Sequence, residues 1–219
     1  MSTTVIWIRH GETADNAQRR IQGWIDTPLH SVGEVQAHST AEHLKNRKVD
    51  AIYSSDLVRC RKTAEIIGQH HRHLPIQICP EIRERGLGKL EGTIYGQVPR
   101  GGHVEGAEPF DVFIARLRSF WSMLFATDRT GQTVLVISHG GPIKAIIPDL
   151  IGTSGYSAPA EIPSTPSIAN CSLTTISVDQ SANPPKGAVV AVSDASHLRA
   201  RDVANDGDFN ADTALEIVS

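Results

Sequence analysis

The sequence predicts an α/β fold, a three-layer α/β/α sandwich with a mostly parallel central sheet. Short apolar runs rich in β-branched residues recur along the chain, and several are nearly unbroken, as expected of strands covered on both faces. Segments with helical spacing of apolar residues separate these runs. This alternation of strand and helix indicates a parallel sheet between helical layers.

The expected elements follow one another in a regular order. The strands are residues 4–8, 49–54, 75–78, 133–138, 172–178 and 188–193. The helices are residues 31–47, 57–71, 108–127 and 141–152, the last disturbed at Pro148. Stripes at helical spacing predict the buried helix faces. They are Val35, His38, Ala41 and Leu44 in the first helix and Phe113, Leu117, Phe120 and Leu124 in the third.

Length and composition suit one domain. The chain has 219 residues, and its 40% hydrophobic content is enough for a substantial core. We expect this domain to span residues 1–198, followed at 199–219 by a polar, acidic tail of a composition typical of partial disorder. Residues 153–170, rich in Pro and Ser, are expected to form a loop, because strand-like sequence resumes after them.

Charge and cysteine usage limit the partners and the compartment. A net charge of -3 argues against nucleic acid or an anionic membrane as the main partner. The opening residues have no basic and apolar regions of a secretory signal, so none is expected, and no run approaches the roughly 20 apolar residues of a membrane span. Three widely spaced cysteines without a C-x-x-C pair fit reduced thiols. We therefore expect a cytoplasmic protein, with the nucleus left open, and exposed strand edges permit a homodimer.

Two histidines follow predicted strands and precede glycines, in "RHG" (9–11) and "SHGG" (138–141). In a parallel α/β sheet, ligands collect at the carboxyl ends of the strands, where helix N-termini also point. The strand at 49–54 runs into a segment that delivers Arg59 or Arg61 to the same edge. Because a guanidinium fork matches phosphate oxygens, Arg9 and such a second arginine predict a site for a phosphate-sized anion.

The histidines predict what happens to that anion. An imidazole with a pKa of about 6.5 is pushed further toward its neutral, nucleophilic form when it lies between cations. One histidine can then attack phosphorus while the other donates a hydrogen bond. A leaving alkoxide needs a proton, and Glu84 is the best candidate for the acid, with Glu81 and Glu91 as competitors.

Five motifs in this order resemble those of the histidine phosphatase superfamily, in its phosphoglycerate-mutase-like branch. They are "RHGETADN" (9–16), "QGWIDTPLHSVGEVQA" (22–37), "SSDLVRCRKTAEII" (54–67), "IRERGLGKLEG" (82–92) and "VISHGGPIK" (136–144). The likeness covers roughly residues 4 to 195 and is greatest to small broad-range phosphatases of fungi and bacteria. It implies an α/β/α sandwich with a mostly parallel sheet, in agreement with the alternating pattern.

The resemblance also implies roles for individual residues. His10 resembles the phosphate-accepting nucleophile, Arg9 and Arg59 the phosphate-gripping arginines, His139 the second pocket histidine and Glu84 the proton donor. Asn16 and Gln22 match positions that line the pocket, and we add Gly23 and Gly140 beside them as phosphate-binding positions. Arg61 is assigned to the rim or to structure. One departure is "GAEP" (106–109) in place of the family's G-E-S, where Glu108 keeps its spacing to Phe113 and Arg116.

These residues predict an enzyme, a phosphoric monoester hydrolase of the histidine acid phosphatase type. It would act on small phosphorylated metabolites through a phosphohistidine and would require no metal or other cofactor. Mutases of this group carry a long insertion with basic residues after the E-G element. The corresponding segment here, residues 93–107, is short and contains a single arginine, Arg100. Two alternatives stay open, a phosphoglycerate mutase or related phosphotransferase and a catalytically silent phosphate-binding protein.

Four further features can be interpreted without a catalytic role. "HHRH" (70–73) closes a helix and fits solvated histidines better than a metal site. Cys60 is expected to be a small buried thiol rather than a nucleophile. Trp24 is expected at the rim of the site, and residues 93–109 and 153–170 are expected to cover the leaving group.

Overall fold

The central sheet has six strands in the order β3-β2-β4-β1-β5-β6. This computed structural model describes residues 1–96, 104–160, 162–163 and 166–199. The strands are β1 (Thr3–Arg9), β2 (Ala51–Ser54), β3 (Ile76–Ile78), β4 (Thr133–Ser138), β5 (Leu173–Asp179) and β6 (Lys186–Asp194). β3, β2, β4 and β1 run parallel, whereas β5 is antiparallel to both β1 and β6. The predicted mostly parallel sheet is confirmed.

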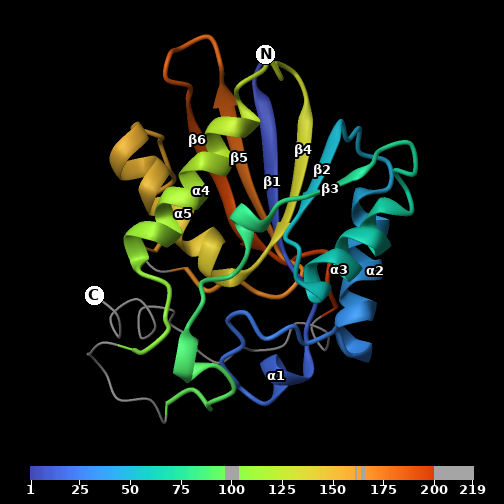
Figure 1. Ribbon diagram of the computed structural model, residues 1–219. Coiled ribbons are helices and arrows are strands. Elements are labelled where there is room, and N and C mark those ends of the chain that lie inside the picture. The colour runs from blue at the N-terminus through green and yellow to red at the C-terminus, as the bar shows by residue number, and fades with distance from the viewer. Residues whose placement is uncertain (97–103, 161, 164–165, 200–219) are drawn as a thin grey trace.

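Helices cover both faces of the sheet (Figure 1). α2 (Ser31–Leu44) and α3 (Val58–Gly68) lie on one face, and α4 (Phe110–Leu124) and α5 (Gly140–Ser154) lie on the other. The short helices α1 (Ala14–Ala17), η1 (Pro80–Ile82) and η2 (Gly88–Leu90) belong to connections. The predicted three-layer sandwich is therefore confirmed.

Strand β1 is buried on both sides because its residues alternate between two hydrophobic cores. Val5 and Trp7 join the core under α4 and α5, where Trp7 meets Phe120 edge-on at a centroid distance of 5.8 Å. Ile6 and Ile8 join the core under α2 and α3. All four are fully buried, which is why the strand reads as an unbroken apolar run.

The buried face of α2 differs from the predicted stripe. Ala41 and Leu44 are buried as predicted, but Val35 is 49% exposed and His38 is also exposed. The helix instead buries small and polar residues, because it packs against the loop that follows β1. Gln36 accepts a hydrogen bond from the Glu12 N–H at 2.8 Å, and a Cβ at Gly33 would lie 2.0 Å from the Glu12 carbonyl oxygen. The buried face of α2 therefore combines apolar residues such as Ala41 and Leu44 with a close approach to this loop.

The other helix predictions fare better. The stripe of Phe113, Leu117, Phe120 and Leu124 in α4 is buried as predicted. Pro148 lies inside α5 without ending it, and the helix stops where Gly155 adopts a left-handed φ of 67°. The predicted tail falls, from residue 200 on, outside the described residues. No helix in the described part of the chain is both long and apolar enough to cross a membrane.

Candidate active site

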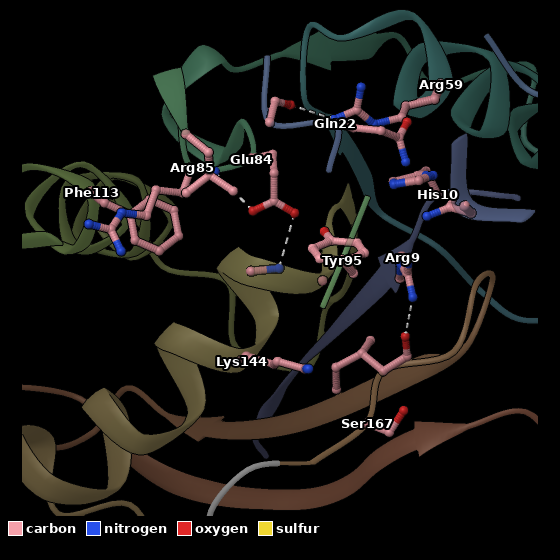
Figure 2. Close-up of a pocket in the computed structure, with 16 residues that line it drawn as sticks. Arg9, His10, Gln22, Arg59, Glu84, Arg85, Tyr95, Phe113, Lys144 and Ser167 are labelled. Carbon is pink, nitrogen blue, oxygen red and sulfur yellow. Dashed lines mark hydrogen bonds between the residues drawn. The ribbon is translucent and has the colours of Figure 1, made fainter. Parts of the chain in front are cut away.

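The predicted site residues gather at the carboxyl ends of the parallel strands, around one cleft. β1 is followed by His10 and β4 by His139, while the connection after β3 carries Glu84. Figure 2 shows His10 and Glu84 at the cleft. The predicted residues that line the cleft are Arg9, His10, Asn16, Gln22, Gly23, Arg59, Glu84 and Gly140. The carboxyl ends of the parallel strands thus bring together residues that lie far apart in the sequence.

His10 presents one ring nitrogen to this cleft. Its Nδ1 lies 2.8 Å from the carbonyl oxygen of Gly11, and since a carbonyl oxygen only accepts, Nδ1 carries the proton. The lone pair of Nε2 is then available to a ligand. Burial, together with the charges of Arg59 and Arg9, lowers the pKa of His10 well below its ordinary value. The ring is therefore neutral at pH 7, as a nucleophile must be.

Arg59 is fixed by the backbone although it is almost completely buried, with 1% of its surface exposed. Its Nη1 donates to the Ile25 carbonyl at 2.7 Å and its Nη2 to the Gly23 carbonyl at 2.9 Å. Its Nε lies 3.2 Å from Nδ1 of His139. A guanidinium has five N–H groups, so one on each Nη is left for a ligand in the cleft. Arg61, two residues further along α3, is exposed, in line with its predicted secondary role.

His139 lies behind Arg59 and is fully buried, and it is not among the described residues that line the cleft. Its Nδ1 accepts from Arg59, so Nε2 carries the proton and donates to Ser55 Oγ at 2.9 Å. Burial first, and then the charge of Arg59, lowers its pKa well below the ordinary value. The sequence predicted a hydrogen bond from this histidine to the ligand. In the structure Nδ1 is used by Arg59 and Nε2 by Ser55, so both ring nitrogens have partners within the protein.

The cleft beside His10 and Arg59 is also lined by Arg9, Asn16 and Gln22. Arg9 donates from Nη1 to the Ile168 carbonyl at 2.6 Å. Asn16 and Gln22 accept hydrogen bonds from Thr13 through their side-chain oxygens, at 3.1 Å from the Thr13 N–H and 3.0 Å from its Oγ1. Their amide nitrogens remain the groups that can donate toward a bound anion.

Glu84 stands opposite His10 and is held by two backbone N–H groups. Its Oε1 accepts from Arg85 at 2.9 Å and its Oε2 from Gly141 at 3.2 Å. A Cβ at Gly141 would lie 2.1 Å from Glu84 Oε1, so glycine is needed for this approach. Of the two competitors, Glu91 is used by the N–H groups of Trp24 and Leu87. Glu81 is exposed and is not among the described residues of the cleft.

The cleft has a second half that sequence analysis did not assign residue by residue. It is lined by Arg85, Leu87, Tyr95, Phe113, Lys144, Ser167 and Ile168, here called the leaving-group end. We call the wall around Arg9, His10 and Arg59 the phosphate end, and Glu84 lies between the two (Figure 2). Tyr95, Ser167 and Ile168 belong to the loops that were expected to cover the leaving group. Lys144 lies one helical turn after Gly140 on α5, but this spacing alone does not show that its side chain faces the cleft.

Other candidate features have structural roles. Cys60 is fully buried with its Sγ 3.3 Å from Nε2 of His139, and burial raises the pKa of its thiol strongly. All three cysteines are free thiols. Within the described ranges, no group of three His, Cys, Asp or Glu side chains is placed to hold a metal ion. Trp24 is 45% exposed at the rim and donates from Nε1 to the Glu84 carbonyl at 2.7 Å.

A neutral, backbone-anchored histidine between two arginines, facing a carboxylate across a cleft, defines an enzyme of phosphoryl-group chemistry on an α/β/α sandwich. Comparison with known proteins agrees. The model of the histidine phosphatase superfamily (branch 1) matches residues 5–186, and the chain belongs to this superfamily.

Similar proteins include both phosphatases and a probable mutase. A metal-independent phosphoserine phosphatase of Arabidopsis thaliana is 33% identical over 66% of this chain and 67% of its own length. A probable phosphoglycerate mutase, GpmB of Shigella boydii, is 32% identical over 90% of this chain and 95% of its own. A solved mycobacterial glucosyl-3-phosphoglycerate phosphatase superposes with a TM-score of 0.74 at 26% identity, covering 88% of this chain and 99% of its own.

Proposed function

We propose that this protein hydrolyses phosphomonoesters of small metabolites through a phosphohistidine intermediate. The observation that carries the proposal is the state of His10, which is neutral with its Nε2 lone pair facing the cleft between Arg9 and Arg59. A cationic side chain would serve only to bind an anion, whereas a neutral imidazole can form a bond to phosphorus.

The reaction has two balanced steps. Nε2 of His10 bonds to phosphorus as the ester P–O bond breaks, and the leaving oxygen takes the proton of Glu84. The Glu84 carboxylate then takes a proton from water, the water oxygen bonds to phosphorus, and the N–P electron pair returns to Nε2. Arg9 and Arg59 balance the charge on the phosphoryl oxygens in both steps. His139 keeps Arg59 in position through the bond between Nδ1 and Nε.

Hydrolysis is favoured over phosphotransfer to a second substrate. The superfamily match and the phosphatases among the relatives bear out the predicted phosphatase, and the mutase-like relatives fit the alternative only weakly. The sequence between Glu91-Gly92 and Glu108 holds one arginine, Arg100, which falls outside the described residues. Turnover with water as the acceptor also separates an enzyme from a silent phosphate-binding protein.

The leaving-group end supports a narrower proposal, that preferred substrates carry a carboxylate near the phosphate. Lys144 is 9% exposed, lines the cleft and directs its amine toward the side where Tyr95 and Ser167 lie (Figure 2). The substrates in the names of two relatives, phosphoserine and glucosyl-3-phosphoglycerate, both bear a carboxylate on the leaving group. A buried ammonium favours such a group over a neutral alcohol.

Replacement of the nucleophile tests the mechanism. We expect His10→Asn to lose at least about 10⁴-fold in phosphate release from phosphoserine, and to lose the acid-labile phosphoryl label that the unaltered protein retains on rapid quenching. His38→Asn, at an exposed histidine on α2, is the matched control and should keep both. Retained turnover in His10→Asn, or release of phosphate without a labelled intermediate, would contradict the proposal.

Four finer expectations remain proposals with their own measurements. The histidine acid phosphatase type would show maximal turnover below neutral pH in a pH–rate profile. Cytoplasmic or nuclear residence is testable with a fluorescent fusion, and a homodimer by light scattering. Binding to nucleic acid or to anionic vesicles, neither of which is expected, can be measured by co-sedimentation.

A further inference from the structure

Arg116, on α4, binds both the segment that carries Glu84 and the carboxylate of Glu108. Nη1 donates to the carbonyls of Glu81 at 2.6 Å and Arg83 at 2.7 Å, and Nη2 donates to the Glu84 carbonyl at 2.9 Å. Nε and Nη2 also donate to the two oxygens of the Glu108 carboxylate, at 2.7 and 2.9 Å. These five bonds account for all five N–H groups of an arginine.

Glu108 holds the same segment from its other end. Its N–H donates to the Gly86 carbonyl at 2.8 Å, and its Oε2 accepts from the Gly86 N–H at 3.3 Å. The carbonyl of Glu108 also accepts from Nε of Arg85 at 2.9 Å. Residues on both sides of Glu84 are therefore tied to one ion pair.

This pair is largely withdrawn from water, with 8% of the Glu108 side chain and 18% of the Arg116 side chain exposed. Because burial removes both charges from water, such an ion pair adds little stability unless its hydrogen bonds are satisfied. The best-attested role of a buried ion pair is to fix one particular arrangement of the chain. Neither residue is among the described residues that line the cleft. The hydrogen bonds of the pair reach the cleft through the 81–86 segment, and Arg116 also lies over the ring of Phe113, with its Cζ 4.8 Å from the ring centroid.

Glu84 itself has little freedom left. Its carboxylate is held by the N–H groups of Arg85 and Gly141, while its carbonyl accepts from both Arg116 and Trp24. A general acid must stay within hydrogen-bond reach of the leaving oxygen, and a displacement of about 1 Å can cost about 10²-fold in rate.

We infer that Arg116 and Glu108 are positioning residues that set the Glu84 carboxyl group for proton transfer to the leaving oxygen. The inference rests on the proposed function, since it assigns these residues to the proton donor of that reaction. It also gives a chemical reason for the spacing between Glu108 and Arg116. Two turns of α4 separate the residues that grip the two ends of the segment.

The test compares two substrates whose leaving groups differ in their need for a proton. An alkyl phosphate requires protonation of the departing oxygen, whereas 2,4-dinitrophenyl phosphate releases a stable anion. We expect Arg116→Lys, which has three donors instead of five, to lower kcat/KM about 30-fold or more for the alkyl ester but less than about threefold for the dinitrophenyl ester. Glu108→Gln should show the same split with a smaller loss.

Arg118→Lys is the matched control, because Arg118 lies on the same helix and pairs with Asp149, but its side chain is 52% exposed. In this variant kcat/KM should change by less than about twofold for either ester. Thermal unfolding of each variant identifies any that fail to fold, and Glu108→Gln then replaces Arg116→Lys in the comparison. Equal losses for both esters in a folded variant, or no loss, would overturn the inference in favour of a purely structural pair.

A double variant separates this inference from the proposed function. Glu84→Gln alone should already show the split between the esters, and adding Arg116→Lys to it should cost the alkyl ester less than about threefold more, because the two changes act through one group. If Glu84→Gln shows no split, the assignment of the acid is wrong. If it shows the split and the two losses multiply in full, the positioning role is wrong.

Discussion

At the phosphate end of the cleft, His10 and Arg59 are anchored by hydrogen bonds to backbone carbonyls. The leaving-group end is instead assembled from separate segments, a connection, a helix and a loop, which carry Tyr95, Lys144 and Ser167. The first arrangement follows directly from strand ends that the sheet fixes in space. The second depends on how separate segments close over those ends. This difference predicts that changes at the phosphate end are costly for every substrate, while changes at the leaving-group end are costly for some.

After replacement of the nucleophile, the largest effect is expected from replacement of the Arg59 guanidinium at the phosphate end. The guanidinium of Arg59 donates to the Gly23 and Ile25 carbonyls and to His139, and it still has two N–H groups for the phosphoryl oxygens. Arg59→Lys removes this planar arrangement of donors. We expect kcat/KM to fall about 10²- to 10³-fold for aryl and alkyl esters alike.

Arg61→Lys supplies the control, because Arg61 is an exposed arginine two residues further along the same helix. Steady-state kinetics with both esters should show less than about a twofold change in this variant. A loss in Arg59→Lys confined to one ester would break the distinction between the two ends.

A smaller effect is expected at the boundary between the ends. The methyl group of Gly141→Ala would occupy the position of the Glu84 carboxylate, since its Cβ would lie 2.1 Å from Oε1. We expect about a 10²-fold lower kcat/KM for an alkyl phosphate and a smaller loss for an activated aryl ester.

Gly152→Ala lies on the same helix, with no atom within 4 Å of its Cβ position, and should keep full activity. Full activity toward the alkyl ester in Gly141→Ala would show that Glu84 can act from a different position. The proton donor would then have to be sought elsewhere in the cleft.

The same contrast explains how much the sequence could predict. His10, Arg59 and Glu84 were predictable because strand ends and local motifs determine where they lie. The buried face of α2 was not, since the side of a helix that packs against a loop depends on close backbone contacts such as that between Gly33 and Glu12. Likewise, the hydrogen-bond partners of His139 could not be predicted. They are Ser55, directly after β2, and Arg59, on α3, and only the folded structure brings them to His139. Lys144 was missed because helical spacing does not show which face meets the cleft.

At the leaving-group end, Lys144→Met should discriminate between substrates. We expect about a tenfold lower kcat/KM for phosphoserine and less than about a twofold change for a neutral alkyl phosphate, because methionine keeps the volume but not the charge. Kinetics with the two esters in parallel provide the measurement, and Lys62→Met, at an exposed lysine, is the control. Equal losses for both esters would remove Lys144 from substrate recognition.

The smallest expected change sharpens the account of the phosphate end, and it concerns the charge of His10 between pH 7.5 and pH 6. A histidine with an ordinary pKa of about 6.5 loses most of its neutral form over this interval. Burial and the two arginines lower the pKa of His10, so the protonated form is disfavoured and the ring should stay mostly neutral down to pH 6. NMR titration of the His10 ring, assigned with His10→Gln, measures this directly. A midpoint near 6.5 would mean that the arginines do not act on the nucleophile as their positions imply. Added inorganic phosphate should move the midpoint upward, because a bound anion stabilises the imidazolium.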